Sequence, residues 1–263
     1  MRAIDTHAHL DFPTFDSDRP KVLQAISQAD LGVINVATSQ ESVRVIDGLT
    51  KKTASVWGMV GLHPTDIGDK TLIELPTQIE YWGNLLKENP KFVGLGEVGL
   101  DYYHQEDNST ASVQKAALRM MLTFAQEQKL PVSFHCRDAY GDLTTLLAEY
   151  KGISGVVHCF SGTQEQAYQF LELGLHISFT AMIGYPGNDI LRQVAVSIPN
   201  DRLLLETDSP FLPVQAKRGT RNDPTAVFDI AEELATIRQV TSQDILGMAL
   251  DNTLKVFPRL VAE

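Results

Sequence analysis

The stretch IDTHAHL at residues 4–10 holds two histidines separated by one residue, within an apolar run typical of a β-strand. Side chains alternate between the two faces of a strand, so His7 and His9 are expected on the same side, while the small Ala8 points away. Two imidazoles placed in this way can bind one cation. Imidazole combined with carboxylate suits Zn²⁺, Mn²⁺ or similar ions, whereas Mg²⁺ prefers more oxygen ligands. The stretch therefore predicts a metal site.

Polar side chains recur at the ends of other apolar runs. A single histidine in such a place is more often a hydrogen-bonded core residue, but five of the seven histidines fall at ends of this kind, and acids accompany them. The potential ligands are His7, His9, Glu97, His135, His158 and Asp208. This set exceeds the needs of one tetrahedral ion with an open position. It suits two ions about 3.5–4 Å apart, with Glu97 as the bridge, as in hydrolytic two-metal sites.

Two ions in such a site would lower the pKa of a shared water and stabilise an anionic transition state. Asp208 could bind metal and also take the proton of that water. Arg137 has the strand parity of His135 and could grip a phosphate, although an ion pair with Asp138 is the alternative. Asp5 could hold the tautomer of a ligand imidazole or be a buried structural carboxylate.

Eight short apolar stretches alternate with longer amphipathic ones, as expected for eight βα units. The expected strands cover residues 3–8, 32–38, 56–62, 92–98, 131–136, 155–160, 176–181 and 202–208. The expected helices cover residues 21–30, 41–52, 77–89, 113–128, 140–151, 163–174, 188–197 and 225–239. A closing helix over 241–257 begins with a capping-box pattern at Thr241 and Asp244.

Continuous apolar strands imply a parallel sheet buried on both faces. We therefore expect the α/β class and a (β/α)8 TIM barrel, formed by residues 1–263 as a single domain. An open doubly wound sheet is less favoured, because no glycine-rich phosphate fingerprint follows the first strand. Active sites of such barrels lie at the C-terminal ends of the strands, where the polar residues above are expected. His176 starts its strand and is expected to be structural.

Composition narrows the function classes. The chain has 22 basic and 33 acidic residues, a net charge of −11, which is unfavourable for electrostatic binding of nucleic acid. A phosphate substrate stays compatible if bound cations supply positive charge locally. Two cysteines suggest no disulfide framework, and neither a signal-peptide core nor a membrane span is recognisable. We expect a soluble cytoplasmic protein without membrane contact.

The ordered motifs resemble the TatD family of metal-dependent hydrolases, among the amidohydrolase-like barrels. The resemblance covers essentially the whole chain. It runs through IDTHAHLD (4–11), VGLHP (60–64), GEVGLDYY (96–103), HCRDA (135–139), HCFSG (158–162), ETDSPFL (206–212) and RNDP (221–224). The HxH pair alone is weakly specific, whereas GEVGLDYY and ETDSP are highly specific.

The resemblance implies hydrolysis of phosphodiester bonds, usually in DNA, with deoxyribonuclease or 3′-exonuclease activity at a divalent-metal site. It implies that His7 and His9 hold the first metal, that Glu97 is the bridge, and that His135 and His158 hold the second, with Asp208 near the nucleophilic water. It further implies that His63 and Arg137 face the substrate phosphate and that Asp101 and Tyr103 shape the mouth. Arg221 and Asn222 match a family segment whose role the sequence does not reveal. The two divalent ions could be Zn²⁺, Mn²⁺ or Mg²⁺.

Other functions stay open at this point. Glu97 stands where the lysine-bridged amidohydrolases have a carboxylated lysine, which argues against that subclass. The acidic balance favours a DNA strand end or a short single strand over a long duplex, and a monomer is favoured. The alternatives are an ester hydrolase acting on a small molecule or on aminoacyl-tRNA, and a non-catalytic metal-binding module.

Overall fold

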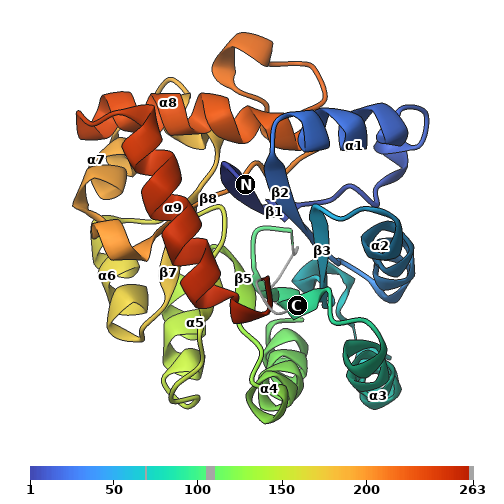
Figure 1. Ribbon diagram of the computed structural model, residues 1–263. Coiled ribbons are helices and arrows are strands. Elements are labelled where there is room, and N and C mark those ends of the chain that lie inside the picture. Colours follow the sequence, from blue (N-terminus) through green and yellow to red (C-terminus); the bar gives the residue numbers. More distant parts are fainter. Residues whose placement is uncertain (69, 105–109, 261–263) are drawn as a thin grey trace.

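The computed structural model describes residues 1–68, 70–104 and 110–260. Within this part of the chain, eight parallel strands form one sheet in which each strand lies beside its predecessor in sequence (Figure 1). The strands are β1 (Ala3–Ala8), β2 (Leu31–Val36), β3 (Val56–Val60), β4 (Phe92–Asp101), β5 (Val132–Arg137), β6 (Gly155–Val157), β7 (His176–Phe179) and β8 (Leu203–Leu205). All eight predicted strands are present, and the (β/α)8 barrel is confirmed.

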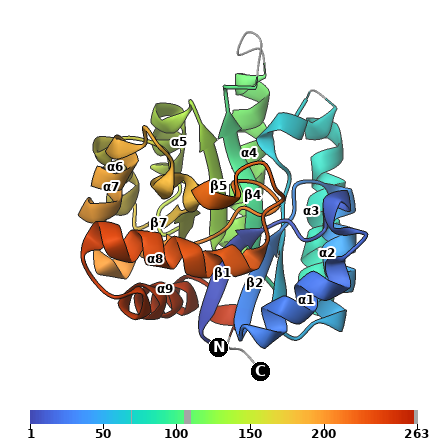
Figure 2. The same cartoon turned by 90° about the horizontal axis from the view of Figure 1, so that it is seen from above.

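An α-helix follows each strand, and the helices stand as a ring around the sheet (Figures 1 and 2). They are α1 (Arg19–Gln28), α2 (Gln40–Lys52), α3 (Thr71–Glu88), α4 (Ala111–Gln128), α5 (Tyr140–Leu147), α6 (Gln164–Glu172), α7 (Asp189–Ser197) and α8 (Val227–Arg238). A last helix, α9 (Ser242–Val256), begins with the predicted capping box at Thr241 and contacts α8, β1 and β8. Among the described residues, every helix is too short or too polar to cross a membrane.

The first and last strands meet at the seam of the barrel. Ala8 forms a single parallel bridge with Ser209 just beyond β8. Deeper in the seam, the buried carboxylate of Asp5 accepts hydrogen bonds from the backbone N–H of Thr207 at 2.9 Å and from its hydroxyl at 2.5 Å. Of the two roles considered for Asp5, the contacts match the structural one, because the carboxylate joins β1 to the segment after β8.

The N-terminal end of the barrel is closed by apolar side chains. Val256, Phe257 and Leu260, from the end of α9 and the turn after it, are buried against the strands. Their partners inside the barrel are Ile4, Ile34, Val36, Met59, Val93, Val156 and Leu204. These side chains form a packed core at this end of the barrel. Burial of apolar surface stabilises the folded state by about 25 cal/mol per Å². The opposite end, where the strands finish, carries the polar residues.

Two of the strands are irregular where they approach that polar end. The pairing register shifts in β1 between Asp5 and Ala8, and in β4 between Leu95 and Val98. His7 and Glu97 lie within these two stretches. Irregularities of this kind bend a strand and redirect its side chains, and they are frequent next to active sites.

His176 occupies the start of β7, the end of the barrel expected for a structural residue. Burial and the nearby charge of Arg202 lower the pKa of this imidazole to about 4.

A lowered histidine pKa makes stability depend on pH. Below pH 6.5 His176 is protonated in the unfolded chain, whereas in the folded protein it stays neutral until the pH approaches 4. The free energy of unfolding therefore decreases as the pH falls from about 6.5 towards 4. Urea denaturation at pH 7.5 and pH 5.0 should show the wild type losing about 1–2 kcal/mol more than the variant His176→Gln. Equal losses in the two proteins would contradict this assignment.

Candidate metal centre

The predicted site residues meet at the C-terminal mouth of the barrel. A cavity of about 820 Å³ opens there. It is lined by His9, His63, Glu97, Asp101, Tyr103, His135, Arg137, His158 and Asp208, nine of the ten residues predicted from the sequence. The tenth, His7, is fully buried beneath them. Residues separated by as much as 200 positions in the chain therefore share one concave site.

Glu97 is the centre of this arrangement. Its Oε2 lies 3.3 Å from Nε2 of His7 and 3.6 Å from Nε2 of His9. Its Oε1 lies 2.7 Å from Nδ1 of His135 and 2.7 Å from Nε2 of His158. One carboxylate thus faces two sets of imidazoles, one set on each oxygen.

Three groups of side chains bring their ligand atoms within 4.8 Å of one another. They are His7 with Glu97 and His158, His7 with His9 and Asp208, and His63 with Glu97 and His135. Nε2 of His7 is buried and has no hydrogen-bond partner among the described residues, a cost that a bound cation would remove. Neutral imidazole nitrogens with carboxylate oxygens suit Zn²⁺ or Mn²⁺, so the donor set fits a divalent metal.

The outer nitrogens of the first two imidazoles are fixed by the barrel wall. Nδ1 of His9 lies 2.9 Å from the carbonyl oxygen of Val36, and Nδ1 of His7 lies 3.0 Å from Oγ of Ser133. A ring that donates Nδ1–H to such a partner presents an unprotonated Nε2, the form that binds a metal. The adjacent strand β2 and the more distant strand β5 therefore orient these rings towards Glu97.

The carboxylate of Asp101 fixes the outer nitrogen of the His135 ring. This buried carboxylate lies 2.9 Å from Nε2 of His135, which leaves Nδ1 of that ring facing Glu97. The same Asp101 Oδ2 also lies 2.9 Å from Nδ1 of His104. Asp101 lines the mouth as expected, and its contacts add a role in positioning a candidate ligand.

Glu206 is a buried acid beside the metal centre that sequence reasoning did not single out. It is fully buried, and its Oε1 lies 3.4 Å from Nδ1 of His158. The same carboxylate accepts hydrogen bonds from the backbone N–H of Cys159 and from the hydroxyl of Ser178, both at 2.5 Å. The sequence did contain one indication of this residue. Glu206 lies two residues before Asp208 at the end of an apolar run, and a carboxylate buried in such a place needs a polar partner. Glu206 thus faces the ring of His158, and we expect its charge to hold that ring in position.

The variant Glu206→Gln tests this positioning role. It keeps the shape of the side chain but removes the charge that faces His158, and such a loss typically costs 10–100-fold in metal affinity. Calorimetric titration with Zn²⁺ should show a decrease of that size, while circular dichroism shows an unchanged fold. Zn²⁺ affinity equal to that of the wild type would refute the role.

The acids and imidazoles of the site shift one another's pKa values. Burial alone would raise the pKa of Glu97, but the imidazoles of His158 and His63 hold that pKa well below its usual value. Burial alone would lower the pKa of His9, but Asp208 and Glu97 raise it to about 9. The acids thus favour positive charge among the imidazoles. A divalent cation would displace those protons, so its affinity should fall with decreasing pH.

The remaining predicted residues lie at the rim. Nε2 of His63 is 3.4 Å from Glu97 Oε1, so His63 belongs to the ligand cluster as well as to the substrate side. Arg137 is exposed, and its guanidinium lies 4.2 Å above the ring of Tyr103, itself 58% exposed. The ion pair with Asp138, considered as an alternative for Arg137, is not formed among the described residues.

The RNDP segment, whose role the sequence left open, supports the loop that carries Asp208. The side-chain amide of Asn222 donates to the carbonyls of Thr207, Phe211 and Leu212 at 2.8–3.2 Å. These bonds hold the chain around Asp208, which has a left-handed φ of 54°.

Arg221 ties the same segment to the region before α1. Its guanidinium donates two hydrogen bonds of 2.7 Å to the carboxylate of Asp18 and lies 4.3 Å above the ring of Phe15. Its contacts are therefore structural.

An eight-stranded barrel with imidazoles and carboxylates gathered around one buried glutamate defines a metal-dependent hydrolase barrel. The sequence matches the family described as TatD related DNase over residues 4–258, and the chain belongs to this family. The resemblance identified from the sequence motifs is thereby confirmed.

Relatives agree over nearly full length. The chain is 32% identical to the Bacillus subtilis metal-dependent hydrolase YabD, covering 96% of this chain and 98% of that protein. It is 34% identical to a Rahnella protein named 3′-5′ ssDNA/RNA exonuclease TatD, covering 92% and 93% of the two chains. The crystal structure of YjjV, a TatD homologue from Escherichia coli, superposes with a TM-score of 0.88 at 32% identity, covering 98% of each chain. The protein is thus a metal-dependent hydrolase of the TatD family.

Proposed function

We propose that the protein is a two-metal phosphodiesterase that removes nucleotides from the 3′ end of a DNA strand or of a short single strand. The observation that carries the proposal is Glu97, whose two oxygens face separate sets of imidazoles. Such a carboxylate is suited to bridge two ions. The exonuclease name of the Rahnella relative supports a nucleic-acid substrate.

In this proposal each oxygen of Glu97 shares an ion with its own set of ligands. His7, His9 and Asp208 would hold one ion together with Oε2, and His135 and His158 would hold the other together with Oε1. When bound, divalent ions in such sites acidify water and stabilise negative charge on a phosphoryl group.

The protein groups act around that centre. Asp208 lines the cavity and accepts the proton of the attacking water. His63 and Arg137 stand on the rim and bind the phosphate oxygens, which orients the scissile bond. The net charge of −11 disfavours a long duplex, so a strand end that enters the mouth is the preferred substrate.

A direct assay tests this function. Protein stripped of metal with a chelator and reloaded with Zn²⁺, Mn²⁺ or Mg²⁺ is incubated with single-stranded and double-stranded oligonucleotides labelled at the 5′ end. Metal-dependent shortening one nucleotide at a time, faster on single strands, is expected, and Glu97→Ala should show none.

Aminoacyl-tRNA and simple carboxylic esters complete the assay. Hydrolysis of these esters without cleavage of DNA would replace the proposal with the ester-hydrolase alternative. No hydrolysis of any substrate by the metal-loaded protein would favour a non-catalytic metal-binding role.

A further inference from the structure

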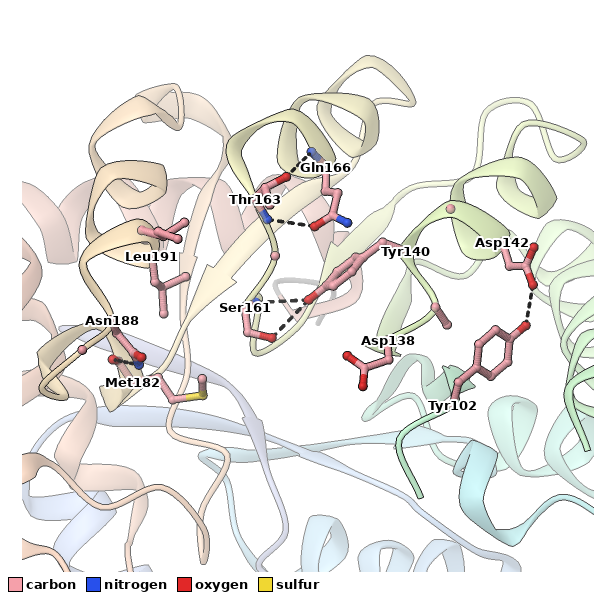
Figure 3. Close-up of a pocket in the computed structure, with 15 residues that line it drawn as sticks. Tyr102, Asp138, Tyr140, Asp142, Ser161, Thr163, Gln166, Met182, Asn188 and Leu191 are labelled. Carbon is pink, nitrogen blue, oxygen red and sulfur yellow. Dashed lines mark hydrogen bonds between the residues drawn. The ribbon is translucent and has the colours of Figure 1, made fainter. Parts of the chain in front are cut away.

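A second hollow, here called the side groove, lies beside the metal centre and has a volume of about 720 Å³. It lies between the start of α5, the segment that joins β6 to α6, and the segment that joins β7 to α7 (Figure 3). Asp138, Tyr140, Ser161 and Met182 line both this groove and the metal-site cavity. The two spaces therefore adjoin, and a substrate can occupy both at once.

One side of the side groove is apolar. It is formed by Met182, Ile190 and Leu191, and the side chain of Ile190 is 64% exposed. Figure 3 shows Met182 and Leu191 together on this side, with Tyr140 opposite them. An exposed apolar surface next to a catalytic mouth is suited to the flat face of a ring.

The other boundaries supply hydrogen-bonding groups. Ser161, Thr163, Gln166 and Asn188 contribute hydroxyl and amide groups to the lining. Thr163 and Gln166 form the capping box of α6, and the amide of Asn188 donates to the carbonyl of Met182 at 2.8 Å, so these groups are held in place. A site that combines an apolar wall with a few fixed polar groups fits a small, flat, polar-edged ligand.

Charge separates the side groove from the metal site. The described residues of its lining include no Lys, Arg or His, but they include Asp138 and Asp142. Asp142 is engaged by Lys115 and by the hydroxyl of Tyr102, each at 2.8 Å. Asp138 is exposed and has no ion pair among the described residues. A phosphate is therefore disfavoured in the groove, whereas an N–H donor is favoured.

We propose that the side groove binds the base of the nucleotide next to the scissile phosphodiester, an inference that rests on the proposed function. The phosphate lies at the metal site beside Arg137, and the base extends over Tyr140 into the groove. There its face packs on Met182 and Ile190, and its edge meets the fixed polar groups. Because Asp138 accepts hydrogen bonds, bases with an exocyclic amino group bind more tightly than thymine.

Gly141 gives a way to fill the groove without touching the metal site. It lies in the first turn of α5, and a Cβ added there would meet nothing within 4 Å. The variant Gly141→Leu places a side chain in the groove. Gly247→Leu is the matched control, because Gly247 is also helical, exposed and open, but lies in α9 away from the groove.

Kinetics on two substrates provide the first test. For a single-stranded oligonucleotide, Gly141→Leu should raise KM at least tenfold, and this rise in KM should be at least tenfold larger than for the same strand with an abasic residue next to the scissile bond, which has no base to place in the groove. Replacing the base next to the scissile bond by an abasic residue should raise the KM of the wild type by a similar factor and should change the KM of Gly141→Leu little. Gly247→Leu should match the wild type throughout. An equal loss on both substrates, or no loss, overturns the base site while leaving the nuclease function intact.

A second readout needs no catalysis. Titration of the wild type with deoxyadenosine should shift the methyl NMR signals of Ile190 and Met182, and Gly141→Leu should abolish these shifts. Thymidine should shift them only at higher concentration. If the protein cleaves no phosphodiester but the shifts occur, the base site stands and the proposed function fails. If deoxyadenosine causes no shift, the base site is rejected.

Discussion

Replacement of Glu97 by glutamine should lower kcat/KM for phosphodiester hydrolysis by about 10³-fold or more. Each carboxylate oxygen lies within 3.6 Å of at least two imidazole nitrogens. Glutamine keeps one acceptor oxygen and turns an NH₂ group towards the other set of rings. That side of the proposed site would then lose its anionic ligand, together with the charge that two ions would share.

Metal analysis separates this cause from a general loss of structure. We expect the metal content of Glu97→Gln to fall from two ions per chain to one or none, with an unchanged far-ultraviolet circular dichroism spectrum. Glu41→Gln is a suitable control, because Glu41 is exposed on α2 and pairs only with Arg44 among the described residues. Full activity with two bound ions in Glu97→Gln would disprove the bridging role.

Much of the fold was predictable because the alternation of apolar strands and amphipathic helices is a local pattern. The rule that strand ends share one face of a barrel then placed Glu97, His135 and His158 together. The contacts around these residues were less accessible. Glu206 and Asp101 face their imidazoles across distances set by different strands, and no spacing within one strand encodes such distances.

Counting along a strand also has a limit, and β1 illustrates it. Alternation places Asp5 on the same face of the strand as His7, which left open both a contact with a ligand imidazole and a structural role. The register shifts between Asp5 and Ala8, and the carboxylate bonds instead to Thr207 across the seam. The side groove was equally hidden, because its walls come from four separate segments that follow β4, β5, β6 and β7.

Replacement of Asp208 by asparagine is the second substitution with a large expected effect. Its Oδ1 lies 3.4 Å from Nε2 of His9, and the residue lines the cavity from the segment after β8. Burial would raise the pKa of Asp208, but its hydrogen bond with His9 and the charges of His9 and His7 outweigh burial and lower it. The carboxylate is therefore ionised at neutral pH and available as a proton acceptor.

Asparagine suits this position because the backbone of residue 208 has a left-handed φ of 54°, a conformation that Asp and Asn tolerate better than other side chains except glycine. The backbone N–H also donates to the carbonyl of His7 at 2.9 Å, a bond that the substitution preserves. The change thus removes the proposed proton acceptor and one proposed anionic ligand while keeping the loop.

We expect Asp208→Asn to lower kcat about 10²–10⁴-fold, the range typical of a lost general base, at every pH between 5 and 9. Because the pKa of Asp208 lies below its usual range, any fall in wild-type activity between pH 7 and 5 is expected to come from protonation of the imidazoles around Glu97. The variant should therefore show the same relative decline over that interval. It should also keep the ion on the His135 side of Glu97, in contrast to Glu97→Gln, which weakens both positions. If Asp208→Asn instead retained the wild-type kcat, another group would have to accept the proton of the attacking water.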